Sequence, residues 1–353
     1  MRAVTAGNGL KSLLVSIGFD RLLGRMFAGR GAILMFHRIR DHDAGLMFEP
    51  NHRNMVAPAL FCALLDTLAA TGVAVVSLEE ALDRLRAKRG GRFVSLTFDD
   101  GYADNHDILL PIVVERALPV TVYVAPGLVD GTAPLWWYGL DHAIARETSI
   151  CLPMAAESVL PATTAAEKQT AFAACAAFML QAKPGEAARF CQALADRHGI
   201  DFSAIAAAEM MDWRKVRAMA ACKWVEIGAH TLSHPPLSRL DEAGARQEMA
   251  ASRERLEAET GRRVVHFAYP FGTPAAVGSR EVRLAADCGF ATAVATDPGN
   301  LFAGHLRQPH DLPRHGIGPL DGPAALRLKL AGATRGLFAA LKRRNSTIAP
   351  ATA

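Results

Sequence analysis

The sequence predicts an α/β protein with a parallel sheet or barrel that is interrupted by a helical insertion. Apolar stretches with strand character alternate with helical stretches on both sides of a long Ala-rich segment, and such alternation is typical of parallel α/β folds. The composition, 50% hydrophobic and 21% charged, is that of a folded globular chain. The 353 residues suffice for a sizeable core. One elaborated α/β domain explains the pattern better than two domains.

The first part of the alternation lies between residues 31 and 125. The stretch "GAILMFHRI" (31–39) is typical of a buried strand that ends in a His-Arg pair. The stretch "FVSLTF" (93–98) predicts a second strand, and two carboxylates follow it directly. The other elements predicted here are a helix over 61–72, a short strand and a helix within 73–91, a helix over 105–117 and a strand over 119–125.

From about residue 135 to residue 217 the alternation stops, and the chain is Ala-rich and helical. We interpret this part as an insertion that carries less of the site chemistry. The alternation then returns with a strand over 224–230, a helix over 241–261, a strand over 264–272, a helix over 280–290 and a strand over 291–296. The predicted catalytic domain therefore covers 31–320, between a basic amphipathic N-terminal segment (1–30) and a basic C-terminal helix and tail (321–353).

The net charge of +4 is unevenly distributed. Residues 1–30 hold five Lys and Arg against one Asp, residues 322–353 hold six against none, and the middle is acidic. The first segment also has apolar residues at helical spacing, namely Phe19, Leu22, Leu23, Met26 and Phe27. Such a helix either lies on an anionic membrane or packs on the body with its basic face in water, and we favour packing slightly. Nucleic-acid binding is not expected, because the basic ends lack an aromatic platform.

The sequence favours a cytoplasmic location, with a peripheral position at the inner membrane surface as the alternative. No apolar run approaches the length of a bilayer span, and the N-terminus lacks a convincing secretory cleavage site. The cysteines are scattered without a CxxC pair, at positions Cys62, Cys151, Cys175, Cys191, Cys222 and Cys288. This spacing predicts neither a zinc knuckle nor a disulfide framework.

Polar residues end four of the predicted strands, where catalytic groups of such folds collect. In "HTLSH", His230 and His234 are four apart, which would place both on one face of a helical turn. This is a spacing for two imidazoles on one metal, although it is weak by itself. One carboxylate of Asp99-Asp100 would complete a two-His-one-Asp site, and the other would remain for proton transfer. The spacing does not say which carboxylate does which.

Three protein ligands leave positions open for water and substrate, as in catalytic zinc sites. The same triad also suits non-haem iron oxygenases, but the adjacent free carboxylate favours hydrolysis. The stretch "FAYPFG" (267–272) is a candidate oxyanion site, because Pro270 lacks an N–H and bends the strand end, which would free the Phe271 amide. By itself this stretch would rather indicate a proline-glycine turn.

These motifs resemble those of the polysaccharide deacetylases, carbohydrate esterases that remove N-acetyl groups from amino sugars. "TFDDGY", "HTLSHPPLSRL" and "FAYPFG" match three family motifs in order, and the agreement extends over most of 31–320 apart from the insertion. The resemblance implies a distorted (β/α) barrel. It also implies Asp99 as the catalytic base and Phe271 N–H as an oxyanion donor. The implied ligands of a divalent metal, usually zinc, are Asp100, His230 and His234.

Two departures from the family pattern leave roles open. The third motif usually has an Arg where this chain has Ala268, so Arg314 or Arg38 is the candidate to orient the base. The late motif that supplies the general acid has no clear match. His315 lies near that region, whereas "LMFHRI" resembles the early His of a branch with permuted motif order, which implies His37 as the acid.

The leading hypothesis is a metal-dependent N-deacetylase of an oligo- or polysaccharide, such as a chitooligosaccharide or an exopolysaccharide precursor. The alternatives are a glycan-binding barrel without activity and, less favoured, an iron oxygenase using the same triad.

Overall fold

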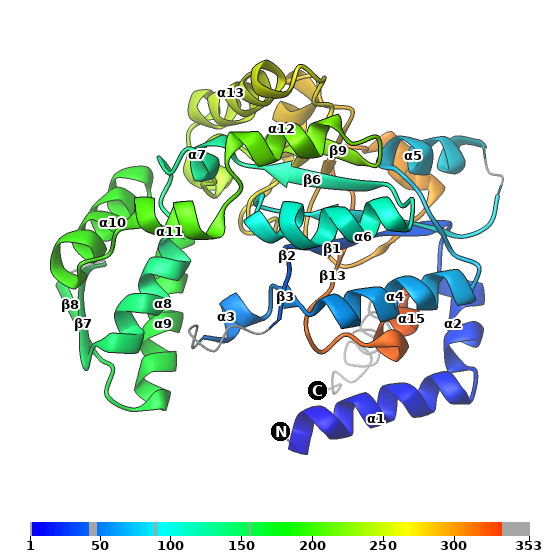
Figure 1. Ribbon diagram of the computed structural model, residues 1–353, viewed down its shortest axis with the longest axis horizontal. Helices are drawn as coiled ribbons and strands as arrows, with labels where there is room; N and C mark the ends of the chain where they lie inside the picture. Colours follow the sequence, from blue (N-terminus) through cyan, green and yellow to red (C-terminus); the bar gives the residue numbers. More distant parts are fainter. Residues whose placement is uncertain (1, 42–47, 88–89, 155–156, 334–353) are drawn as a thin grey trace, which may run out of the picture.

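A curled, mostly parallel sheet forms the centre of the computed structural model, which describes residues 2–41, 48–87, 90–154 and 157–333 (Figure 1). The strands are β1 (Gly31–Phe36), β2 (Arg38–Ile39), β3 (Met55–Val56), β4 (Ala74–Val75), β5 (Phe93–Phe98), β6 (Val120–Val124), β7 (Ser149–Pro153), β8 (Glu157–Pro161), β9 (Val225–Ala229), β10 (His266–Ala268), β11 (Thr292–Val294), β12 (Asn300–Leu301) and β13 (His315–Gly316).

The helices are α1 (Arg2–Ser16), α2 (Phe19–Phe27), α3 (Glu49–His52), α4 (Pro58–Ala70), α5 (Leu78–Ala87), α6 (Leu110–Glu115), α7 (Pro126–Val129), α8 (Trp136–Arg146), α9 (Ala165–Met179), α10 (Pro184–His198), α11 (Phe202–Glu209), α12 (Trp213–Ala221), α13 (Glu242–Thr260), α14 (Ser279–Asp287) and α15 (Pro323–Leu330). A π-helical turn, η1 (Asn105–Leu109), precedes α6, and two short 3-10 turns are η2 (Leu237–Arg239) and η3 (Ala303–Arg307).

The main sheet has the strand order β11-β10-β9-β6-β5-β1-β12, in which only β12 runs antiparallel to its neighbour. The sheet curls because the segment from Leu312 to β13 bonds to strands on both of its sides. Leu312 bridges Val294 on β11, and β13 pairs in parallel with β1. The prediction of a distorted (β/α) barrel is therefore confirmed.

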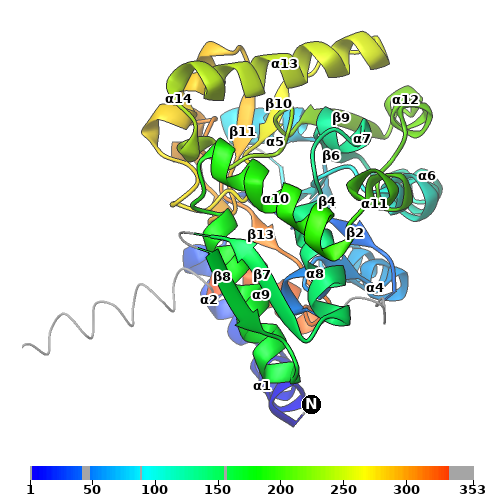
Figure 2. The same cartoon turned by 90° about the vertical axis from the view of Figure 1, so that its left-hand side faces the viewer.

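Alternate residues of strand β5 point to the two opposite faces of this sheet. Val94, Leu96 and Phe98 pack outward into the main core, against helices that surround the sheet, including α4, α6, α12 and α13 (Figures 1 and 2). Phe93 instead belongs to a smaller apolar cluster with Tyr123 and Ala268 on the inner side. Because successive strand residues point to opposite faces, Thr97 and then Asp99 follow Phe93 on the inner side.

The insertion forms a separate lobe beside the sheet, with its own apolar core (Figure 1). We predicted it to be helical, but it also contains the antiparallel hairpin β7-β8. Its C-terminal limit was predicted at 217, which falls inside α12, and α12 packs against β9 of the barrel. The lobe proper therefore ends with α11. Among the described helices, none is both long and apolar enough to cross a bilayer.

Candidate metal centre and active site

The pairing of β1 with β5 places His37 beside Asp99. The register pairs Met35 with Thr97 and Phe36 with Phe98, and the Asp99 amide donates to the carbonyl of Phe36 over 3.0 Å. Since both strands are parallel, the next residue of each lies at the same end of the barrel. Asp99 is 2% exposed, whereas His37 is half-buried and lines a cavity of about 350 Å³.

Asp100, His230 and His234 form a buried three-residue cluster of potential metal ligands. The Nε2 atoms of His230 and His234 lie 3.3 and 3.2 Å from Oδ1 of Asp100. Two imidazoles and one carboxylate are the donor set of a catalytic zinc site that keeps coordination positions open.

The loop that carries the two histidines is not the helical turn that the spacing predicted. Residues 230–234 have no helical structure, and Thr231 and His234 adopt left-handed backbone angles, with φ of 61° and 60°. The Thr231 hydroxyl accepts from the His234 amide over 3.0 Å, and the Glu248 carboxylate accepts from the amides of Leu232 and Ser233. These bonds, and not a helix, bring both imidazoles to Asp100.

Strained backbone is concentrated at this site. Five non-glycine residues of the described chain have positive φ, and four of them are Asp100, Thr231, His234 and Phe271. Such conformations cost free energy and persist where the surroundings enforce them, often at functional sites.

The electrostatics of the cluster fit a bound cation. Burial would raise the pKa of Asp100, but hydrogen bonds from both imidazoles hold it well below its usual value. Burial would lower the pKa of His230, yet Asp100 and Asp99 raise it, so the cluster favours positive charge at this position. Nδ1 of His230 lies 2.7 Å from the carbonyl of Ala268, and donation there leaves Nε2, on the side of Asp100, as the nitrogen that would coordinate a metal.

Arg314 is the residue that orients Asp99. Its Nη1 and Nη2 donate to Oδ1 and Oδ2 of Asp99, both over 2.7 Å, and its Nε donates to the Ala295 carbonyl over 2.9 Å. Burial alone would raise the pKa of Asp99, but the guanidinium of Arg314 lowers it below the usual value. Asp99 is therefore held as an anion in one orientation.

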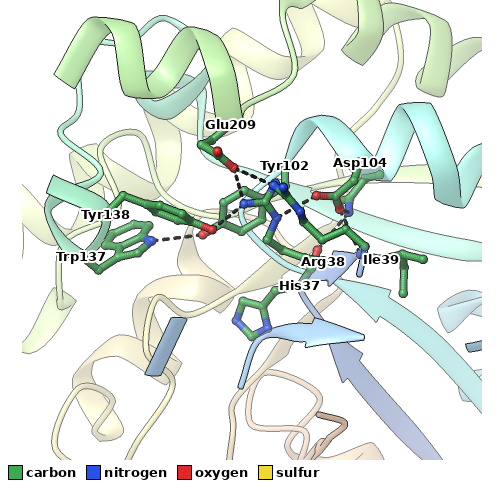
Figure 3. Close-up of polar contacts among 10 residues, drawn as sticks. His37, Arg38, Ile39, Tyr102, Asp104, Trp137, Tyr138 and Glu209 are labelled. Carbon is green, nitrogen blue, oxygen red and sulfur yellow. Dashed lines mark hydrogen bonds and ion pairs between the residues drawn. The ribbon is translucent and has the colours of Figure 1, made fainter. Parts of the chain in front are cut away.

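Arg38, the other candidate to orient the base, contacts a different carboxylate. Its Nε donates to Asp104 over 2.7 Å, its Nη1 donates to Tyr138 and Glu209, and its guanidinium lies 4.4 Å from the Tyr102 ring centroid (Figure 3). Arg38 follows His37 directly, so the two side chains leave the strand end on opposite sides. The hypothesis that Arg38 orients Asp99 is therefore wrong.

The Arg38 contacts fasten the insertion to the barrel, because Tyr138 lies on α8 and Glu209 ends α11. Next to Tyr138, the indole of Trp137 donates to the Tyr102 hydroxyl over 3.2 Å, and its ring centroid lies 5.3 Å from that of His234. Trp136, Trp137 and His234 also line a cavity of about 290 Å³. The insertion thus forms one wall of the site, although the cluster of potential metal ligands and Asp99 lie outside it.

Sequence reasoning did not single out these wall residues or Glu248. The tandem tryptophans at the start of the insertion were the one available signal, since paired aromatic residues are common in ligand sites.

We expect Arg38→Met to destabilise the protein by about 3–5 kcal/mol, because it leaves the Asp104 and Glu209 carboxylates without their buried partner. Denaturant unfolding measures this loss, and hydrogen exchange should show faster opening of α8 and α11. Arg84→Met is the control, since Arg84 pairs with Glu80 at the surface and such pairs contribute up to about 1 kcal/mol. Equal losses in the two variants would contradict the fastening role.

The other sequence-predicted residues differ in accessibility. Phe271 is half-buried, its ring centroid lies 5.0 Å from that of His234, and its backbone N–H finds no acceptor among the described residues. His315 is 1% exposed, and its Nε2 lies 2.9 Å from Asn300 Oδ1. It lies on β13 opposite Leu34 of β1, and Leu34 precedes His37 by three residues.

A curled parallel sheet with a two-His-one-Asp cluster and a separate buried carboxylate at its mouth is an arrangement typical of metal-dependent hydrolases. A family model described as polysaccharide deacetylase matches residues 86–293, more than half of the chain. The chain belongs to the polysaccharide deacetylase family and is a hydrolase of the polysaccharide N-deacetylase type. No curated protein sequence matched the chain.

Several solved structures have the same fold. A Streptococcus pyogenes deacetylase, PplD, solved in complex with acetate, is 19% identical with a TM-score of 0.57, over 85% of this chain and 97% of that one. IcaB from Ammonifex degensii is 17% identical with a TM-score of 0.55, over 86% and 97%. The BpsB deacetylase domain from Bordetella bronchiseptica is 17% identical with a TM-score of 0.50, over 81% and 95%. At these identities the likeness concerns the fold alone.

Proposed function

We propose that this protein hydrolyses the N-acetyl groups of amino sugars in an oligo- or polysaccharide, with a divalent metal, taken to be Zn²⁺, at Asp100, His230 and His234. The observation that carries the proposal is the pairing of this buried donor cluster with a second carboxylate, Asp99, held apart from it by Arg314. The substrate class follows from the family, and a chitooligosaccharide or an exopolysaccharide precursor fits it.

A divalent metal bound at the cluster would lower the pKa of a bound water and polarise the acetamide carbonyl. Asp99 accepts the proton of the attacking water. It must be an anion to do so, and the contact with Arg314 lowers its pKa and keeps it one. The free N–H of Phe271 donates to the oxygen that becomes negative after attack. When the C–N bond breaks, the sugar amine takes a proton and acetate leaves, and we assign this proton transfer to His37.

Two cavities whose walls include candidate site residues offer room for the glycan. His234 and Trp137 line one of them, and His37 lines the other. If one sugar ring packed against Trp137, the adjoining sugars of the glycan chain would lie along the barrel mouth.

Acetate release from a panel of N-acetylated oligosaccharides tests the proposal, measured on purified protein before and after chelation and after return of Zn²⁺ or Co²⁺. We expect chelation to abolish release while the fold is kept, because the ligands lie at the rim of the barrel. Full activity of verified metal-free protein would refute the metal-dependent mechanism. Binding of oligosaccharides without acetate release would favour the glycan-binding alternative, and iron-dependent oxygen consumption would favour the oxygenase.

For the general acid, we expect His37→Ala to lower kcat by about 10²–10⁴-fold with metal retained, the usual loss when general-acid catalysis is removed. His315→Ala is the matched control, because His315 is buried on β13 beside β1 and bonds to Asn300. It should lower the melting temperature but change kcat little. The reverse pair of results would assign the acid to His315.

A further inference from the structure

The two N-terminal helices expose an apolar surface that the barrel does not cover. Of the eleven large hydrophobic side chains exposed in the described part of the chain, six lie between residues 10 and 27. They are Leu10, Leu13, Ile17, Leu22, Met26 and Phe27, which we call the apolar stripe. Monomeric soluble proteins rarely expose such residues in one contiguous group without a binding function.

The stripe is the outer face of helices whose other face is packed. α1 lies along α15 (Figure 1), and Leu14 and Val15 on its inner side are half-buried. Leu10, Leu13 and Ile17 are spaced three and four residues apart, so they share the opposite face. The expectation that this segment simply packs on the body therefore explains one face of each helix only.

The charge beside the stripe is positive. Asp20 is the single acidic residue of 1–30, and it is 8% exposed and paired with Arg327 over 2.7 Å. Arg21 and Arg25, in contrast, are exposed. Between these helices and the body lies a groove of about 1460 Å³, and Arg21, Arg25, Arg92 and Arg327 line it.

The C-terminal part of the sequence is basic as well. α15 ends at Leu330, near α2, where Gly332 approaches Phe27 closely. The sequence after residue 333 contains Arg335, Lys342, Arg343 and Arg344 and no acidic residue.

We propose that the apolar stripe and the arginines beside it dock this protein on an anionic lipid bilayer. Apolar side chains next to Lys and Arg are the combination that binds the interface of anionic membranes. The strands run toward the insertion, and α1 lies along the side of the barrel (Figure 1), so docking through the stripe leaves the barrel mouth uncovered. This inference does not depend on the proposed deacetylation.

Sedimentation of the full-length protein with vesicles tests the proposal. The probes are vesicles of phosphatidylcholine alone and vesicles that also contain phosphatidylglycerol. We expect the protein to sediment with the anionic vesicles at low salt, to be released substantially by high salt because surface charges are screened, and to stay in the supernatant with phosphatidylcholine.

Two double variants separate the contributions. Leu13→Glu with Ile17→Glu should abolish binding, and Arg21→Glu with Arg25→Glu should weaken it at least tenfold. Val114→Glu with Val159→Glu is the control, because it adds the same charges at exposed apolar positions elsewhere, 48% and 66% exposed. This control should bind like the parent protein.

A parent protein that stays in the supernatant with anionic vesicles at low salt overturns the proposal, as does equal loss in the control. A second result would also overturn it. If vesicle binding is absent and the parent forms a concentration-dependent dimer that Leu13→Glu with Ile17→Glu dissociates, a second copy of the chain covers the stripe. Acetate release from soluble oligosaccharide should be the same in all variants, so failure of vesicle binding and failure of the proposed function are distinguishable.

Discussion

Asp99→Asn should retain metal and lose turnover by about 10²–10⁴-fold, whereas Asp100→Asn should lose metal itself. The two carboxylates are adjacent, but Asp99 bonds to Arg314 and Asp100 to both imidazoles. An amide at position 99 cannot accept the proton of water, which removes general-base catalysis. An amide at position 100 removes the anionic donor of the cluster. Metal content and acetate release measured on both proteins check the prediction.

Circular dichroism of both variants must first show the parent fold, because each substitution is in a buried network. Equal metal loss in the two proteins would reject the division of roles. Normal turnover of Asp99→Asn would assign the base elsewhere.

Arg314→Met is expected to abolish activity and to lower the free energy of unfolding by about 3–5 kcal/mol, since it leaves the buried Asp99 carboxylate without its partner. Arg314 is 0% exposed, and it donates to Asp99, Thr97 and the Ala295 carbonyl. Denaturant unfolding of metal-free protein measures the loss.

The double variant Asp99→Asn with Arg314→Met is the control for this prediction. With no buried charge left unpaired, most of the stability should return, while activity should not. A single variant as stable as the parent would show that the ion pair contributes nothing to the fold.

Removing Arg314 should also reverse the pH dependence that Asp99 gives to the free energy of unfolding. In the parent, Arg314 lowers the pKa of Asp99, so the pair's stabilisation is present above the unfolded pKa and is lost on acidification. In Arg314→Met, burial is left to raise the pKa of Asp99. The free energy of unfolding of the variant should then fall as the pH rises from the unfolded pKa through that raised value, and acidification below the raised value should recover it.

The sequence by itself determined the alternating elements, the family and the identity of the donor residues. Buried strands such as 93–98 are recognisable because consecutive apolar residues end at charged ones, and β5 has these bounds. The strand predicted over 264–272 is wrong in extent, since β10 covers only His266–Ala268. Beyond it, Phe271 has a positive φ, and a strand pattern does not signal where the backbone turns left-handed.

Only the tertiary structure decided the partner of each side chain. His37 and Arg38 are neighbours in the sequence, but the strand alternation sends one toward Asp99 and the other toward the insertion. Arg314 reaches Asp99 because the segment of Leu312 and β13 inserts between β11 and β1, a pairing between residues more than 200 positions apart in the sequence. The sequence spacing of His230 and His234 suggested a helical turn, whereas Thr231 and Glu248 hold a loop instead. Spacing along a chain specifies local geometry, but contacts between distant strands and loops follow from how the sheet curls, and this curl is set by packing across the whole barrel.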